Sequence, residues 1–231
     1  MRSQRRLVNP IDNIDRSLIF NYRFNEISGT TLIDHSGNNL NGINNGVLIN
    51  QTGKIDKSYL FRGSPENIVI ADSPKIQFGT GDFTFCTWIN LSDIPSATNA
   101  QATIVSKNYT GFEVSIYQSK LLAYLGGAAI GNQLIGNTIF NTNQWYFIIL
   151  QRKNSVASFE INRVGDVSKT ITSDISRIGQ ALNLGRRPGG TSGQYFKGNM
   201  DAMSLYNYAL SEAQKDDLFN NGNGIEYNLI Y

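Results

Sequence analysis

Residues 196–222, FKGNMDAMSLYNYALSEAQKDDLFNNG, decide the fold, because an alternating run passes directly into a short helix. The alternation in DAMSLYN is typical of a β-strand, with Asp201 at its start. Ser211 predicts a helix N-cap, Gln214 three residues later completes a capping box, and Gly222 predicts the stop. A helix of about two turns is not stable alone, so we expect it to pack against the β-structure.

Short strand-like runs continue along most of the chain. With 231 residues, 40% of them hydrophobic and 16% charged, the chain is long enough for one all-β domain with a buried core. Turn signals such as SGNN, GTGD and RRPGGTSG separate the runs, which is typical of a β-sandwich or jelly roll. We expect one domain over residues 17–222, an N-terminal arm over 1–16 and an apolar tail over 223–231. The strand-like runs are SLIFNYRF, SYLF, NIVIA, FTFCTWINL, ATIVSK, FEVSIY, LLAYL, WYFIILQR, ASFEIN, ALNLG and DAMSLYN.

The net charge of the chain is concentrated in its N-terminal arm. The first 16 residues carry four arginines against two aspartates, which accounts for the whole formal net charge of +2. The neutral remainder argues against nucleic-acid binding by the folded body, and we expect the basic arm to be solvated. No apolar run approaches the roughly 20 residues of a membrane-spanning helix, so no membrane insertion is expected. The N-terminal arginines are not followed by the apolar stretch of a secretory signal.

The tail carries a strand-like pattern of its own. Ile225, Tyr227 and Leu229 alternate with polar residues, which predicts an edge strand or an extended arm on a hydrophobic groove. Apolar residues left in water would make an adhesive stretch that folded chains tend to avoid. Two outcomes therefore stay open: the tail folds back on its own sandwich, or the termini pack on a neighbouring copy and form a homo-oligomer.

Nine segments follow one another over nearly the whole of residues 18–222. They are YRFNEISGTTLIDHSGNNLNG, YLFRGSPENIVIADSP, GTGDFTFCTWI, IVSK, FEVSIY, LLAYL, NQWYFIIL, ALNLG and FKGNMDAMSLYNYALSEAQ. In this order they resemble the laminin-G-like jelly roll of the concanavalin A-like lectin/glucanase superfamily. The resemblance implies two antiparallel sheets stacked face to face, with a late Gly-x-x-Asp strand and a small helix that closes one edge. It also implies that Trp88 and Trp145 are aromatic core residues that pack rather than bind a ligand.

Groups suited to catalysis are scarce in the sequence. Glycoside hydrolysis needs two carboxylates about 5–10 Å apart, and the Glu-x-Asp-x-x-Glu pattern of the glucanase branch is absent. Glu113 and Glu160 lie on separate predicted strands, and we expect each to face outward. His35 is the single histidine, in a predicted turn, and Cys86 is the single cysteine, in a run that predicts a buried thiol. We therefore expect no enzyme, with a glycoside hydrolase or polysaccharide lyase as the less favoured alternative.

The resemblance implies a structural calcium ion. Relatives often hold calcium between an early Asp-x-Ser-Gly turn and the late Gly-x-x-Asp strand, and the acidic residues at those positions are Asp34 and Asp201. Asp201 has an alternative role, in which its carboxylate bonds to backbone amides of a loop. The pentraxin branch has acidic calcium ligands after its Leu-Gly strand, where this chain has Arg186 and Arg187, so Glu66 is expected to pair with an arginine or with water.

These features favour a non-catalytic recognition or adhesion module that binds a glycan or a cell-surface protein through rim loops of the sandwich. Sugar sites combine an aromatic face with amide and hydroxyl groups, and loops 92–102, 107–111, 125–133 and 186–195 are rich in both. The expected ligand-binding residues are Asn108, Tyr109, Arg186, Arg187 and Tyr195. The alternative is a structural or adhesive subunit of a virus particle or surface appendage, located in the virion or at the cell surface.

Overall fold

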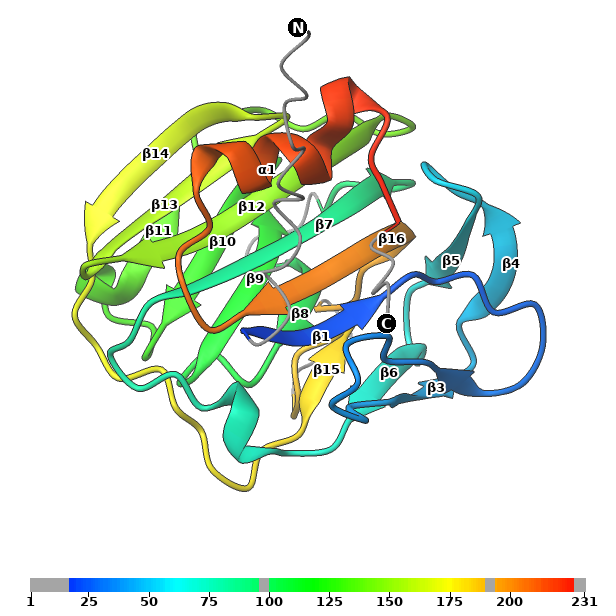
Figure 1. The fold of residues 1–231 in the computed structure, drawn as a ribbon, viewed down its shortest axis with the longest axis horizontal. Helices are drawn as coiled ribbons and strands as arrows, with labels where there is room; N and C mark the ends of the chain where they lie inside the picture. The colour runs from blue at the N-terminus through cyan, green and yellow to red at the C-terminus, as the bar shows by residue number, and fades with distance from the viewer. Residues whose placement is uncertain (1–16, 96–99, 190–193, 227–231) are drawn as a thin grey trace, which may run out of the picture.

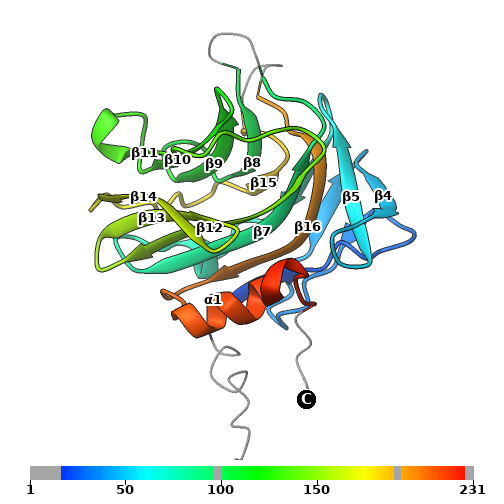
Figure 2. The same cartoon turned by 90° about the horizontal axis from the view of Figure 1, so that it is seen from above.

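The computed structural model describes residues 17–95, 100–189 and 194–226. These residues form two antiparallel sheets of eight strands each, stacked face to face as curved layers (Figures 1 and 2). The two-sheet antiparallel sandwich predicted from the sequence is therefore confirmed. Within the described ranges, no helix is long and apolar enough to cross a membrane.

The first sheet contains the longest strands of the molecule. Its order is β14-β13-β12-β7-β16-β5-β4, and β1 pairs with the last residues of β16. β16 is irregular after Asp201, where Ala202 has a positive φ of 44°. The strands are β1 (Leu18–Tyr22), β4 (Leu48–Thr52), β5 (Lys57–Arg62), β7 (Phe83–Leu91), β12 (Trp145–Lys153), β13 (Val156–Ile161), β14 (Val164–Thr170) and β16 (Lys197–Tyr206).

The second sheet lies across the apolar core from the first. Its order is β11-β10-β9-β8-β15-β6-β3-β2, so β15, from late in the chain, lies between the earlier strands β8 and β6. Its strands are β2 (Thr31–Leu32), β3 (Gly42–Asn45), β6 (Asn67–Ile70), β8 (Ala102–Ser106), β9 (Phe112–Tyr117), β10 (Lys120–Leu125), β11 (Gln133–Ile135) and β15 (Leu182–Leu184). Alternate residues such as Phe112, Val114 and Ile116 fill the space between the sheets and are fully buried.

All eleven strand-like runs in the sequence form strands, and five further strands were not predicted. The unpredicted strands are β2, β3, β4, β11 and β14. β4 and β14 end the order of the first sheet and are half-exposed or exposed along their whole length. β4 and β14 pair with their neighbours through backbone hydrogen bonds but lack alternating apolar residues. The pattern that identifies a strand in a sequence is therefore missing from them.

The helix α1 (Glu212–Phe219) lies on the outer face of the first sheet, away from the second (Figure 2). Its N-terminus is as predicted, because the Ser211 side chain and the Gln214 side chain form both bonds of a capping box. The predicted stop at Gly222 is three residues late. The helix ends at Phe219 because Asn220 takes a left-handed conformation with a φ of 47°.

A second apolar cluster joins the first sheet to α1. Trp88 is 2% exposed and stacks on Phe219 of the helix, with ring centroids 5.8 Å apart. Trp145 is partly buried against the same cluster. The two tryptophans therefore pack, as expected, but they do so under the helix rather than between the sheets. We call this group the helix cluster, and its buried members are Leu18, Cys86, Trp88, Phe147, Ile149, Tyr206, Leu210 and Leu218.

Charged side chains tie α1 to strand β13 at the edge of the helix cluster. Glu160 of β13 forms ion pairs with Arg163 and with Lys215, and Lys215 is almost completely buried. Arg163 also pairs with Glu212 at 2.7 Å and with Asp216 at 2.8 Å on the helix. Glu160 was expected to face outward into solvent, but its carboxylate is partly buried because the helix supplies a cation to it.

The first residues of the tail fold back on their own sandwich. Gly224 has a φ of 72° and packs so closely on Ile55 and Trp88 that a Cβ would overlap both. The Asn25 side-chain amide donates a hydrogen bond to Glu226. The contacts of the sandwich thus continue past residue 222, as far as Glu226. Residues 1–16 and 227–231 lie outside the described part, so a homo-oligomer formed through the termini stays a prediction.

Candidate functional site

Three of the four predicted rim loops meet over β8, β9 and β10, on the outer face of the second sheet. Antiparallel pairing puts Glu113 of β9 opposite Tyr124 of β10 and opposite Ser106 of β8. Phe112 and Val114, on either side of Glu113, belong to the core, so the Glu113 side chain lies on the outer side of the sheet. This outer side is where the predicted ligand-binding residues can be compared with the structure.

A buried ion pair joins Arg187 to Glu113. Arg187 Nε donates to Glu113 Oε2 at 2.8 Å and Nη2 donates to Oε1 at 2.5 Å, which is a bidentate arrangement. Ser106 Oγ donates a third hydrogen bond to Oε2 at 2.7 Å. Glu113 is fully buried and the Arg187 side chain is 13% exposed. Burial lowers the pKa of Arg187, but the hydrogen bond and negative charge of Glu113 outweigh it and hold that pKa above its ordinary value.

Two neighbouring tyrosines pack against the Arg187 guanidinium. The Arg187 Cζ atom lies 5.4 Å from the ring centroid of Tyr109 and 5.3 Å from that of Tyr124. The two rings meet edge to face, with centroids 6.2 Å apart. Both distances fall within the range of cation–π attraction, so the guanidinium has little freedom to move. Tyr109 is 37% exposed and is the member of the group that offers an aromatic surface to solvent.

Gln101 completes the hydrogen bonding of the group. Its Oε1 accepts from Arg187 Nη2 at 2.8 Å and from Ser115 Oγ at 3.3 Å, while its Nε2 donates to the Tyr124 hydroxyl oxygen at 3.1 Å. Gln101 comes from the loop before β8, Tyr109 from the turn after it, and Arg187 from the loop after β15. We name Gln101, Tyr109, Glu113, Tyr124 and Arg187 the Arg187 cluster.

Of the predicted ligand-binding residues, the structure brings Tyr109 and Arg187 together. It also corrects the expectation for Glu113, which is on the outer side of its sheet but is buried, because Arg187 covers it. Gln101 and Tyr124 were missed. A signal for Tyr124 exists in the sequence, since a two-residue turn in FEVSIYQSKLLAYL gives a register that puts Glu113 beside Tyr124.

Arg186 and Tyr195 form a separate pair next to the Arg187 cluster. Their backbones form an isolated β-bridge, and the Arg186 Cζ atom lies 5.9 Å from the Tyr195 ring centroid. Within the described ranges, Arg186 makes no ion pair with a carboxylate. This pair therefore adds an aromatic ring and a positive charge at the edge of the cluster.

Asn108 shapes a loop rather than facing the Arg187 cluster. It has a φ of 67°, and its Oδ1 accepts from the backbone N–H and the hydroxyl of Thr110 at 3.2 Å each. These bonds form a tight turn that carries Tyr109. Loop 125–133 lies beside the same turn, since the Gly126 N–H donates to the Gly111 oxygen at 2.7 Å.

Asp34 is fully used by hydrogen bonds within its own turn and the adjoining strand β1. Its Oδ1 accepts from the backbone N–H of Asn21 at 3.0 Å and of Ser36 at 2.9 Å. Its Oδ2 accepts from the Ser36 hydroxyl at 2.8 Å and from the Leu40 N–H at 3.0 Å. The carboxylate thus fixes the shape of the turn after β2.

Asp201 bonds to a loop in the alternative way that the sequence left open. Its Oδ2 accepts from the backbone N–H groups of Lys54 and Ile55, at 2.8 Å each. Its Oδ1 is buried and accepts no well-formed hydrogen bond. Burial raises the pKa of Asp201 to about 7, although the backbone N–H groups of the loop act in the opposite direction.

The two aspartates offer little for a shared calcium ion. They have no hydrogen-bond partner in common, and three of their four carboxylate oxygens already accept hydrogen bonds. Within the described part of the chain, no three acidic, histidine or cysteine side chains gather in a group that could hold a metal ion. Calcium at Asp34 and Asp201 stays a prediction that these contacts do not favour.

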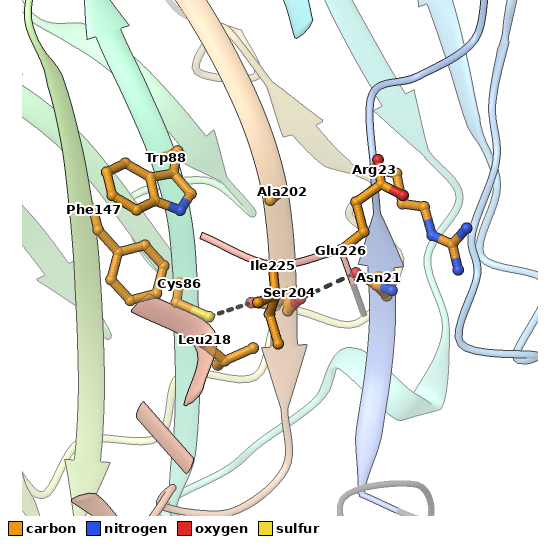
Figure 3. A pocket seen from close by; sticks show the side chains of 10 residues that line it. All are labelled: Asn21, Arg23, Cys86, Trp88, Phe147, Ala202, Ser204, Leu218, Ile225 and Glu226. Carbon is orange, nitrogen blue, oxygen red and sulfur yellow. Dashed lines mark hydrogen bonds between the residues drawn. The ribbon is translucent and has the colours of Figure 1, made fainter. Parts of the chain in front are cut away.

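A small cavity beside Asp201 lies between the helix cluster and the start of the tail. Figure 3 shows Trp88, Phe147 and Cys86 on one side of it and Arg23 and Glu226 on the other. Its volume of about 10 Å³ is close to that of a single water molecule. Burial raises the pKa of the Cys86 thiol to about 12, so it remains protonated and packs as an apolar side chain.

The two isolated glutamates do not form a catalytic pair with each other. Glu113 lies on the outer side of the second sheet with Arg187, whereas Glu160 lies beneath the helix on the outer side of the first sheet with Lys215. The whole sandwich separates them. Glu66 forms an ion pair with Arg62, as expected.

Two curved antiparallel sheets with one helix on an outer face define a lectin-like β-sandwich. A family model described as the concanavalin A-like lectin/glucanases superfamily matches residues 63–214, which is more than half of the chain. The chain belongs to this superfamily, and the predicted resemblance is confirmed. No curated protein matches the chain in sequence.

Several solved structures share the fold. The binding domain of Paraclostridial Mosquitocidal Protein 1 has a TM-score of 0.71 and 19% identity over 90% of this chain and 53% of its own. A botulinum neurotoxin serotype D ligand-binding domain in complex with N-acetylneuraminic acid has a TM-score of 0.70 and 16% identity over 91% and 52%. A Trypanosoma rangeli sialidase, solved as a covalent intermediate with 2,3-difluorosialic acid, has a TM-score of 0.65 and 12% identity over 90% and 34%. The chain therefore spans about half of each toxin domain, and these identities establish a common fold alone.

Proposed function

We propose that this protein is a non-catalytic recognition module that binds a glycan through the Arg187 cluster at the rim of the second sheet. The observation that carries the proposal is the guanidinium of Arg187, fixed by Glu113 and packed against the adjacent rings of Tyr109 and Tyr124. Fixed hydrogen-bond donors beside an aromatic face are the groups that a sugar ring needs, because it has hydroxyls at its edge and C–H groups on its faces.

Preorganisation supports a binding role for this cluster. A flexible arginine loses rotamer freedom when it binds a ligand, whereas Arg187 is already held by two side-chain oxygens of Glu113 and by Gln101. The exposed face of Tyr109 then adds apolar contact area at small entropic cost. Gln101, Tyr109 and Arg187 come from three different loops, so variation of the loops can change the ligand without changing the sandwich.

The family and its structural neighbours support the same function at a coarser level. The superfamily carries lectins as well as glucanases in its description, and one neighbour is a toxin domain solved with N-acetylneuraminic acid. The non-catalytic reading is supported by the ion pairs that occupy Glu113 and Glu160, since a general acid or nucleophile must be free to exchange a proton or form a bond.

A glycan array probed with the full chain tests the proposal, followed by titration of the best ligand into two variants. Tyr109→Ala should weaken binding about tenfold, because the loss of an aromatic face costs roughly 1.4 kcal/mol. Tyr117→Ala is the matched control, because Tyr117 lies at the far end of β9 and belongs to no part of the cluster. Equal affinity of the two variants, or no glycan bound, would contradict the proposal.

Binding to a cell-surface protein and a role as a subunit of a virus particle or appendage stay predictions. A cell-surface protein would contact the same rim loops, whereas a particle subunit would associate through the termini. Light scattering of the full chain distinguishes the particle subunit from a monomeric recognition module, since the subunit should self-associate at high concentration.

A further inference from the structure

We infer that the Arg187 cluster, if it binds glycans as proposed above, selects neutral sugars and rejects acidic ones. The inference rests on the proposed function and concerns the chemical class of the ligand. It follows from two features of the cluster. The first is that the charges of Arg187 and Glu113 neutralise each other, and the second is which hydrogen-bond donors and acceptors remain unused.

The positive charge of Arg187 is already neutralised by Glu113. The two groups make a bidentate pair with atoms 2.8 Å and 2.5 Å apart, so the guanidinium edge that would grip a carboxylate is occupied. Glu113 cannot move aside, because it is fully buried and also accepts a hydrogen bond from Ser106. An acidic sugar would therefore bring a second negative charge to one positive charge in a partly desolvated place, which is repulsive.

The groups that remain available are suited to hydroxyls. Nε–H and the two N–H groups of Nη2 are used by Glu113 and Gln101, which leaves Arg187 Nη1 as the donor. Arg187 also forms a hydrogen bond with the Tyr124 side chain, so only part of this remaining donor capacity faces a ligand. The Tyr124 hydroxyl can donate, and Gln101 Nε2 keeps one N–H group besides the one that it donates to Tyr124, whereas Gln101 Oε1 already accepts two hydrogen bonds. A sugar hydroxyl also donates and accepts, so it can join this network without leaving a buried group unpaired.

The charges around the cluster are of two kinds. Lys107, directly after β8, is fully buried and forms an ion pair with Asp72, so it attracts no anion. Arg186 lies against Tyr195, and Arg177 lies beside Gly111 in the turn that carries Tyr109; neither pairs with a carboxylate in the described ranges. An acidic sugar could bind here only by using one of these two cations, and Arg186, the neighbour of Arg187, is the residue on which the test turns.

Matched pairs of glycans provide the test, each pair differing only by one acidic group. Lactose is compared with 3′-sialyllactose, N-acetyllactosamine with its 6-sulfated form, and further neutral disaccharides with their uronic-acid counterparts, against the full chain. We expect the neutral member of a bound pair to bind at least about tenfold more tightly. Its affinity should also be nearly the same in low salt and in about 0.5 M NaCl, because no net charge is involved.

The outcomes separate this inference from the proposed function. Binding to acidic members alone, or equally to both members, overturns the charge selection but leaves a glycan-binding module. Binding to no glycan overturns the proposed function and the inference with it. Arg186→Gln should change the affinity for the neutral ligand by less than about twofold. A large loss in Arg186→Gln would show that this half-buried cation carries recognition, and would overturn the inference.

Discussion

The outer faces of the two sheets are built in opposite ways. The outer face of the first sheet is apolar and closed, because α1 lies over it (Figure 2) and covers the helix cluster. Within this cluster Trp88 stacks on Phe219. The outer face of the second sheet carries Glu113 and Tyr124, and in place of a helix a single arginine covers its buried carboxylate. Apolar burial on the outer face of the first sheet thus stabilises the fold. The outer face of the second sheet instead holds polar groups in fixed positions at the surface.

The sequence of each strand already contains this difference. WYFIIL is apolar throughout and FTFCTWI is interrupted only by Thr84 and Thr87, and such runs belong to strands that are buried on both faces. FEVSIY alternates instead, with Glu113 and Ser115 on one side. The comparison teaches that a run without alternation marks the sheet face that a further element must cover, and that a charged residue in an alternating strand is not evidence of exposure.

Trp88→Ala should have the largest effect on the closed face. Removal of a nearly fully buried tryptophan from between a sheet and a helix should lower the free energy of unfolding by about 3–5 kcal/mol. Denaturant unfolding measures this change. Trp145→Ala, at a partly buried position in the same cluster, is the control and should cost less. If glycan binding disappears in Trp88→Ala while the protein is still folded, the two faces are not independent.

Glu113→Gln should have the largest effect on the polar face. It leaves the Arg187 charge without its partner in a mostly buried place, and we expect a loss of about 3 kcal/mol. The double variant Glu113→Gln/Arg187→Gln should lose less than the sum of the two single variants, as measured by a double-mutant cycle in denaturant. A single variant as stable as the wild-type chain would mean that the pair does not hold the cluster.

Asp201 should give the first sheet a dependence on pH. Its folded pKa of about 7 lies above the usual range, so between about pH 4 and 7 the folded state keeps a proton that the unfolded state has released. Stability from this group therefore falls as the pH rises, by roughly 1 kcal/mol per pH unit. In chelator, the difference in unfolding free energy between Asp201→Asn and the wild-type chain should shift in favour of the variant with rising pH.

The same measurement decides the calcium prediction. Calcium needs the ionised carboxylate, so a bound ion would remove the pH dependence and raise the melting midpoint by stabilising the folded state. A midpoint that is the same with chelator and with calcium, both in the wild-type chain and in Asp201→Asn, would exclude calcium at this position.

Glu212→Gln should have the smallest effect on the free energy of unfolding. It tests whether apolar contacts, rather than ion pairs, attach α1 to the first sheet. Glu212 pairs with Arg163 and Lys215, but its side chain is 74% exposed, so its loss should cost about 0.5 kcal/mol. Leu218→Ala, on the same helix but buried in the helix cluster, should cost about 2–3 kcal/mol in the same denaturant experiment. A larger loss for Glu212→Gln than for Leu218→Ala would mean that charge, rather than apolar burial, attaches the helix.

The sequence was sufficient for the two-sheet sandwich, the positions of eleven strands along the chain and the capped helix. Edge strands such as β4 and β14 escaped because their pairing depends on a neighbouring backbone and leaves no apolar pattern. Within the site, Tyr109 and Arg187 were predicted because aromatic and cationic residues in loops suggest ligand contacts. Glu113 was missed because the cation that buries it is 74 residues away in the sequence, and no local pattern reports such a pairing.

The position of the two tryptophans has a practical consequence for spectroscopy. Both Trp88 and Trp145 belong to the helix cluster, and the chain contains no other tryptophan. Intrinsic fluorescence therefore reports whether α1 is docked on the first sheet, with Phe219 stacked on the Trp88 indole. The Arg187 cluster contains tyrosines instead, on the far side of the sandwich. A ligand can saturate that cluster while the tryptophan emission stays unchanged. An unchanged tryptophan spectrum on addition of a glycan is therefore expected for binding at the rim and does not indicate a lack of binding.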